Sequence, residues 1–291
     1  MISFFTIFFK YLILVCLSLQ GYMLSPFDNR SNRTIIWQAG SNYPRIKKTR
    51  CLADKHNIDY IQTFRFIELN NSLRETIDKS TKNTDPCGVN VKIILYIGPT
   101  RKQLNSLEDI SYWLTHNYQL YNKNKDMFEQ IFGHNNIMLQ IYDEPSNFED
   151  IEIINSFCKL YPNHSYFLST NKKSLQFIKY LPIKCFKLID FHSYGTAQQY
   201  PQIFIKLINS FILAIQSDFD LDYSITVPIF NKYVKESNNF ERRTVHPTTI
   251  KYLVDNYFIK PSYYGAYLSP NTGFMQDDNL YSLFEIYTEK N

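Results

Sequence analysis

Eight short segments rich in β-branched and aromatic residues recur along the chain, and longer segments separate them. Where strands alternate with helices, neighbouring strands pair in parallel through right-handed helical crossovers. Eight such units in about 265 residues match the usual size of a (β/α)8 TIM barrel with a single domain. The predicted strands are 34–38, 59–64, 91–97, 137–142, 165–169, 186–192, 223–228 and 263–268.

Several of the connecting segments have helical periodicity. In 148–160, Ile151, Ile154 and Phe157 share one face, and acidic residues occupy the first turn, where the helix dipole favours them. An open doubly wound sheet is the alternative fold, but no Gly-x-Gly-x-x-Gly motif follows the first strand. The predicted helices are 107–121, 148–160, 174–181, 202–216 and 248–258.

The first 24 residues are typical of a secretory signal peptide, because apolar runs at 2–9 and 11–19 precede polar sequence. A retained signal anchor is the alternative, since the apolar run approaches the roughly 20 residues that span a bilayer. We expect the barrel to occupy 25–291 and the mature protein to be secreted, extracellular and free of the membrane after signal cleavage.

Four cysteines lie beyond the signal segment, and an even number in a secreted chain predicts disulfide bonds. Three pairings are possible. On the predicted topology, Cys51–Cys87 and Cys158–Cys185 each join a helix to the start of a strand two units later, so we favour these two bonds. Four sequons fit a secreted glycoprotein, and their acceptors are Asn29, Asn32, Asn70 and Asn163.

Charge and motifs exclude several functional classes. With 31 basic and 27 acidic side chains, the net charge of +4 is too small to indicate nucleic-acid binding. The six histidines do not cluster at metal-ligand spacing, and the sequence contains no P-loop, Gly-x-Ser-x-Gly elbow or His-Glu-x-x-His motif. We therefore expect neither a metal nor an organic cofactor.

Two adjacent carboxylates end the fourth predicted strand, where the chain reads Tyr142-Asp143-Glu144-Pro145. Active sites of TIM barrels lie at the carboxyl ends of the strands. Neighbouring acids raise each other's pKa, so one of them can stay protonated near neutral pH and act as a general acid. The alternative is that the pair begins a loop and caps the next helix.

This four-residue motif resembles the Asp-Glu pair of (β/α)8 glycoside hydrolases that act on N-acetylhexosamines, and families 20 and 123 are nearest in motif. The resemblance implies that Glu144 is the acid/base that protonates the leaving glycosidic oxygen. It also implies that Asp143 orients the 2-acetamido group, whose carbonyl oxygen attacks the anomeric carbon.

The end of strand 223–228 bears on the same question. Retaining barrels with two catalytic acids place a nucleophilic carboxylate there, but the first acid after this strand is Glu236. A protein nucleophile is therefore not expected. This agrees with substrate-assisted hydrolysis and equally with an absence of catalysis.

Other candidate residues for substrate binding come from the ends of other strands. Asp190 and His192 share one face of strand 186–192 by the period-two rule and can bind a sugar hydroxyl or support the acid. A buried polar layer is the alternative for this pair. Tyr194 can donate to the acetamido oxygen, as a Tyr does in the resembled families. The remaining candidates are Trp37 as a sugar platform, Arg65 for ring hydroxyls or a surface ion pair, Asn231 and Tyr267.

These observations favour a secreted glycoside hydrolase-like protein that hydrolyses β-linked N-acetylhexosamines of a carbohydrate or glycoconjugate. Two alternatives stay open: a non-catalytic secreted barrel that binds glycan or protein, and a barrel hydrolase of another type. The second would act through Asp143, Glu144 and His192. The sugar, the linkage and the oligomeric state are not determined at this level.

Overall fold

The computed structural model describes a barrel and the elements around it, all within the unit Asn32–Asn291. The described residues are 33–38, 43–55, 58–63, 66–79, 90–99, 103, 109–162, 166–192, 200–215, 221–228, 252 and 263–268. The predicted signal segment lies outside them. No helix in these ranges is long and apolar enough to cross a bilayer.

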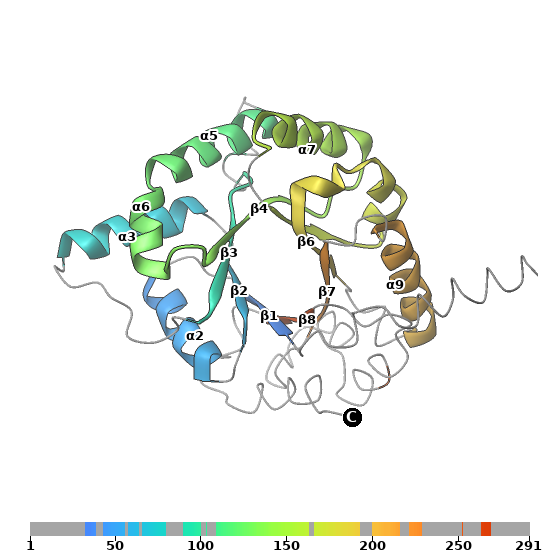
Figure 1. Ribbon diagram of the computed structural model, residues 1–291, viewed down its shortest axis with the longest axis horizontal. Helices are drawn as coiled ribbons and strands as arrows, with labels where there is room; N and C mark the ends of the chain where they lie inside the picture. Colours follow the sequence, from blue (N-terminus) through green and yellow to red (C-terminus); the bar gives the residue numbers. More distant parts are fainter. Residues whose placement is uncertain are drawn as a thin grey trace, which may run out of the picture. The chain divides into compact units, whose positions relative to one another are not determined.

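Parallel strands form the centre of the molecule (Figure 1). Each strand pairs in parallel with the next along the chain, and β8 pairs with β1, so that the sheet closes. The predicted α/β barrel is therefore confirmed, and the open doubly wound sheet is wrong. The strands are β1 (Arg33–Gln38), β2 (Tyr60–Thr63), β3 (Lys92–Tyr96), β4 (Ile137–Asp143), β5 (Tyr166–Thr170), β6 (Phe186–His192), β7 (Asp222–Pro228) and β8 (Tyr263–Leu268).

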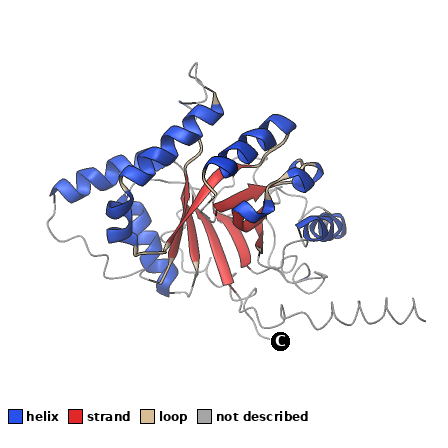
Figure 2. Ribbon diagram, turned by 45° about the horizontal axis from the view of Figure 1, so that its top comes forward, coloured by secondary structure: helices blue, strands red, loops and turns tan. Residues whose placement is uncertain are grey.

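Helices cover the outer face of the sheet (Figures 1 and 2). The predicted helix at 107–121 begins later, at Ile110, because the Asp109 side chain caps it by accepting from Tyr112 N at 2.6 Å. The predicted helix at 248–258 lies outside the described residues except for Tyr252. The described α-helices are α2 (Tyr43–Lys55), α3 (Phe66–Lys79), α5 (Ile110–Lys123), α6 (Lys125–Phe132), α7 (Phe148–Leu160) and α9 (Pro201–Ile215).

The segment between β5 and β6 differs from expectation. The helix predicted at 174–181 is wrong, because three short 3-10 turns replace it: η2 (Ser174–Gln176), η3 (Ile178–Tyr180) and η4 (Ile183–Cys185). Pro182 lacks an N–H and forces Leu181 into an extended conformation (φ −71°, ψ 147°), so a regular helix cannot continue to β6.

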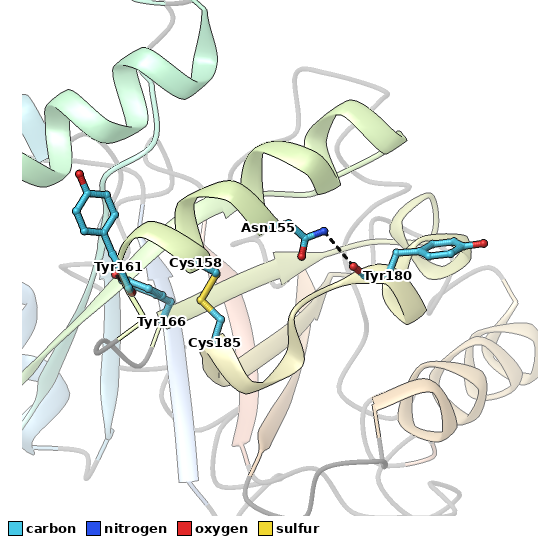
Figure 3. The surroundings of a disulfide bond; sticks show 6 residues. All are labelled: Asn155, Cys158, Tyr161, Tyr166, Tyr180 and Cys185. Carbon is cyan, nitrogen blue, oxygen red and sulfur yellow. Dashed lines mark hydrogen bonds between the residues drawn. A yellow bond between two sulfur atoms is a disulfide. The ribbon is translucent and has the colours of Figure 1, made fainter.

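A disulfide fastens this segment to α7. Cys158 near the end of α7 is bonded to Cys185 in η4, and Asn155 Nδ2 donates to Tyr180 O at 3.3 Å (Figure 3). The predicted pairing of Cys158 with Cys185 is therefore confirmed. Cys51 is also disulfide-bonded, but its predicted partner Cys87 lies outside the described residues.

Two apolar layers and one polar layer follow from strand alternation. Large apolar side chains fill the space between the sheet and the helices. A smaller apolar cluster plugs the barrel interior and consists of Ile35, Tyr60, Ile94, Met138, Phe167, Leu188 and Tyr263. Towards the carboxyl ends of the strands, the inner face turns polar and buried, with Gln62, Gln140, Ser169, Asp190, Ser224 and Thr226. This polar layer is the floor of the candidate active site.

Candidate active site

A β-bulge near the end of β4 decides which side chains enter the barrel. Gln140 pairs with Phe167 and Tyr142 pairs with Leu168, so Ile141 is an extra residue in β4. As a result Gln140 and Asp143 share the inner face, and Gln140 Nε2 lies 3.4 Å from Asp143 Oδ1. Tyr142 turns outward instead, and its hydroxyl donates to Asp150 Oδ1 at 2.5 Å in α7. The bulge thereby places Asp143 over the polar layer.

The acid pair does not cap the following helix. Asn147 is the N-cap of α7, and its side chain accepts from Asp150 N at 2.9 Å. Asp150 in turn accepts from Ser146 N at 2.6 Å. Since other residues satisfy the start of α7, the capping alternative for Asp143 and Glu144 is wrong.

Glu144 has a backbone conformation that few non-glycine residues adopt. Its φ of 51° lies in the left-handed region, which costs a side-chain-bearing residue on the order of 1–3 kcal/mol. Its N–H donates to Ser169 O at 2.9 Å, which extends the pairing of β4 with β5 by one residue. Such a cost persists only where surrounding contacts enforce it, and strained residues of this kind are concentrated at functional sites.

Both carboxylate oxygens of Glu144 contact polar side chains from neighbouring strands. Glu144 Oε1 lies 3.0 Å from His192 Nδ1 at the end of β6. Glu144 Oε2 accepts from Asn171 Nδ2 at 2.7 Å, just after β5. Three consecutive strands therefore converge on this carboxylate.

His192 is held on its other side by Asp190. The two residues share the inner face of β6, as predicted, and are 3% and 0% exposed. His192 Nε2 lies 2.7 Å from Asp190 Oδ2, an ion-pair distance without the angle of a good hydrogen bond. Asp190 Oδ1 accepts from the Ser224 hydroxyl and, at 2.9 Å, from the Thr226 hydroxyl. Asp190 and His192 thus belong to a buried polar layer, as the alternative expected, and His192 also contacts Glu144.

The charge of His192 follows from its two carboxylate neighbours. Burial by itself would lower the pKa of His192, but the charges and contacts of Asp190 and Glu144 outweigh it and raise the pKa to about 10. The imidazole is therefore protonated at neutral pH. One imidazolium stands between two carboxylates.

Asp143 has a different environment from Glu144. The residue as a whole is exposed at the end of β4, whereas its carboxylate is crowded by protein groups. This crowding raises the pKa of Asp143, and the His192 charge and a hydrogen bond from the Ser169 hydroxyl offset part of the rise. Asp143 therefore holds a proton more readily than an ordinary aspartate does, and the residue lies at the exposed end of β4.

The three side chains also lie close enough together to be considered as metal ligands. One ligand atom from each of Asp143, Glu144 and His192 lies within 4.8 Å of the others. Both nitrogens of His192 already face carboxylates, so a metal would have to displace a ring proton and one of these contacts. This donor set fits an ion-pair cluster and does not fit a metal site.

Sequence reasoning missed several residues of the site. Asn171 is held by an Asx turn in which its Oδ1 accepts from Lys173 N at 2.8 Å and Ser174 N at 3.3 Å. Ser169 and Gln140 lie beneath Asp143 and are linked at 2.8 Å. The sequence offers one local signal for Asn171 as a site residue. It is an Asn immediately after a barrel strand, and polar residues follow it.

A half-buried tyrosine also belongs to this end of the barrel. Burial raises the pKa of Tyr96 on β3, and the negative charge of Asp143 raises it further. Gly98 leaves room for this ring, because a Cβ at that position would come within 2.3 Å of it.

The structure describes only part of the remaining predicted set. Trp37 and Tyr267 are register partners on β1 and β8, and their side chains lie outside the described part of the chain. Arg65, Tyr194 and Asn231 lie outside it altogether, as do three of the sequon acceptors, Asn29, Asn32 and Asn163. Asn70 is 4% exposed within α3, which argues against a glycan at this position of the folded chain.

No protein-family model and no curated protein matches the chain. Among solved structures, it is similar to the tryptophan synthase subunit alpha from Campylobacter jejuni, with a TM-score of 0.49, 12% identity, and 89% of this chain and 95% of that chain covered. An endo-beta-N-acetylglucosaminidase from Cordyceps militaris gives a TM-score of 0.49 and 10% identity over 91% of this chain and 94% of that chain. The GH99 endo-alpha-mannosidase from Bacteroides thetaiotaomicron gives a TM-score of 0.46 and 14% identity, with 85% of this chain and 79% of that chain covered. These neighbours include glycoside hydrolases, but likeness at this level assigns neither a family nor an activity.

Proposed function

We propose that the protein is a secreted glycoside hydrolase of (β/α)8 type that cleaves β-linked N-acetylhexosamines with the substrate's acetamido group as nucleophile. The observation that carries the proposal is the carboxylate of Glu144, held between His192 and Asn171 beside the exposed Asp143. The proposal takes 1–24 as a signal peptide and 25–291 as the barrel.

The contact between Glu144 and His192 can supply the proton for the leaving group. The 3.0 Å contact joins the protonated His192 Nδ1 to the Glu144 carboxylate, so the imidazolium can pass its proton to Glu144. With the proton on Glu144, the carboxyl group can protonate the glycosidic oxygen as the bond to the anomeric carbon breaks. The carboxylate left behind then takes a proton from the water that opens the cyclised intermediate, and Asp190 keeps the imidazole oriented throughout.

Asp143 is suited to hold the acetamido group. Its Oδ1 accepts from Ser169, and the same carboxylate can accept the acetamido N–H, so that the carbonyl oxygen of the substrate turns towards the anomeric carbon. One oxygen of Asp143 lies within 4.8 Å of one oxygen of Glu144. The acetamido group and the leaving group can therefore be served by neighbouring carboxyl groups, and attack by the acetamido oxygen followed by water gives net retention of configuration.

Exposed aromatic side chains near the site support a carbohydrate substrate. Phe148 and Tyr180 are 57% and 46% exposed, with ring centroids 5.2 Å apart. Phe148 begins α7 four residues after Glu144, so it belongs to the carboxyl-end rim of the barrel. Aromatic faces pack against the apolar faces of sugar rings, and this pair can do so in a chain with only two tryptophans.

One observation favours the second candidate, a non-catalytic barrel that binds glycan or protein. Both oxygens of Glu144 are engaged by protein donors, so a glycosidic oxygen must displace one of these contacts or share its oxygen. In a protein that has lost catalytic activity, Glu144 could keep these contacts as part of a binding site.

The test is turnover of chromogenic β-N-acetylglucosaminide and β-N-acetylgalactosaminide by the purified secreted protein. Glu144→Gln keeps the shape of the side chain and removes the acid, so turnover should fall by about 10²–10⁴. The loss should be smaller for substrates whose leaving group needs no proton. The matched control is Glu149→Gln, an exposed acid in the first turn of α7. A folded wild type that turns over neither substrate and does not bind a thiazoline mimic of the intermediate would favour the non-catalytic barrel.

A further inference from the structure

A cavity lies at the opposite end of the barrel from the acid pair. It has a volume of about 320 Å³, and its lining includes residues at the starts of β2, β3, β4 and β6. Since β4 runs from the cavity lining at Ile137–Leu139 to Asp143 at the candidate active site, the two sites are separated by about 13 Å or more along the strand. The cavity is therefore a separate site.

The charges that line the cavity are mainly positive. Lys92, Lys125 and Lys187 contribute ammonium groups, and Glu129 is the one lining acid among the described residues. Glu129 is already engaged, because its carboxylate contacts Lys125 Nζ at 3.4 Å and His134 Nδ1 at 3.0 Å. It therefore leaves the two other lysines uncompensated.

Lys92 and Lys187 lie at the starts of β3 and β6. The Nζ of half-buried Lys92 lies 5.6 Å from the centre of the Tyr60 ring, and no acid among the described residues pairs with either lysine. Asp59 and Asp222 act on the Tyr60 hydroxyl, but they do not line the cavity. Like charges that share a cavity repel one another, and a bound anion relieves this repulsion.

We propose that this cavity binds a divalent oxyanion, the phosphate or sulfate group of a small molecule. The volume is at the lower end of the range for small-ligand sites, about 300–1,000 Å³, which suits one such group with a small substituent. Asn135 adds a carboxamide that can donate to oxyanion oxygens, whereas the Asn136 Nδ2 in the same lining already donates to Phe132 O at 3.0 Å. Three ammonium groups and one carboxylate give the lining a net charge of +2, which a ligand group with a charge of −2 would neutralise.

The test measures the binding of inorganic phosphate and inorganic sulfate to the full chain by calorimetry, against sodium chloride at equal ionic strength. The double variant Lys92→Gln/Lys187→Gln should bind phosphate about 10-fold or more weakly than the wild type. The control Lys123→Gln/Lys159→Gln removes the same charge from exposed positions outside the cavity and should bind as the wild type does. If the first double variant does not fold, Lys125→Gln takes its place.

Two outcomes would overturn the proposal: equal affinity in the lining and control variants, or a wild-type response to phosphate no larger than that to chloride. A sugar phosphate or sugar sulfate that binds more tightly than the free ion would identify the group as part of a larger ligand. Since the lysines lie at the opposite end of the strands from the acid pair, the lining variants should keep whatever turnover the wild type has. Failure of this proposal and failure of the glycosidase proposal are thus separable.

Discussion

The Asn171 side chain donates to Glu144 Oε2 at 2.7 Å and so ties the end of β5 to the acid at the end of β4. The same side chain organises its own turn, because its Oδ1 accepts from Lys173 N and Ser174 N. The carboxamide oxygen of Asn171 therefore stabilises the turn, and its nitrogen contacts Glu144.

This division of roles predicts different results for two substitutions of Asn171. Asn171→Asp keeps an oxygen for the Asx turn but replaces the donor to Glu144 with a second carboxylate, so stability should change little while the pH–rate profile shifts. Asn171→Ala removes both roles and should cost about 1 kcal/mol of stability as well. Denaturant unfolding and kcat against pH measure the two effects. An unchanged pH profile in Asn171→Asp would show that the amide acts only on the turn.

The proposed acetamido nucleophile predicts the stereochemistry of the reaction. If the acetamido group is the nucleophile, the first product released should be the β-anomer, which NMR can follow before mutarotation. Asp143→Asn should slow the reaction because the acetamido group loses its orienting acceptor, and thiazoline inhibition should weaken in parallel. Release of the α-anomer first would contradict the substrate-assisted mechanism.

The raised pKa of His192 predicts how stability depends on pH. The folded-state pKa of about 10 lies above the ordinary value of 6.5, so the protonated ring stabilises the fold. This contribution is fully present below about pH 6.5 and is lost as the pH rises towards 10. Unfolding free energies at pH 6, 8 and 10 should therefore decrease in that order.

Two histidine variants serve as a matched pair for this measurement. His192→Gln should cost roughly 3–5 kcal/mol at neutral pH, because it leaves two buried or half-buried carboxylates without their cation. It should also flatten the decline between pH 6.5 and 10. His134→Gln removes an exposed ring and should leave the decline in place. An identical pH dependence in wild type and His192→Gln would contradict the charge assigned to His192.

The Cys158–Cys185 bond should be a major contributor to stability. It closes a loop with a sequence separation of 27 residues, for which chain entropy predicts about 3–4 kcal/mol. Cys158→Ser/Cys185→Ser should lower the free energy of unfolding by that amount. Peptide mapping without reduction should link the two cysteines, and it also tests Cys51–Cys87. Free thiols at all four positions would argue against an oxidising compartment.

The sequence by itself determined the class of fold and one covalent link. Regular alternation of strand and helix patterns is a local property of the chain, and it predicted parallel strands in an α/β barrel. Cys158 and Cys185 followed from that topology, and period two placed Asp190 and His192 on one face, because β6 is regular through them.

Tertiary structure alone decided the geometry of the acids. An extra residue in β4 moves every later side chain to the other face, and periodicity carries no sign of such a bulge. The left-handed conformation of Glu144 is enforced from outside its own segment, by pairing with Ser169 and by contacts with Asn171 and His192 that are 27 and 48 residues distant. Contacts at such separations depend on closure of the barrel, so local sequence could place the acid pair at the rim but not orient it.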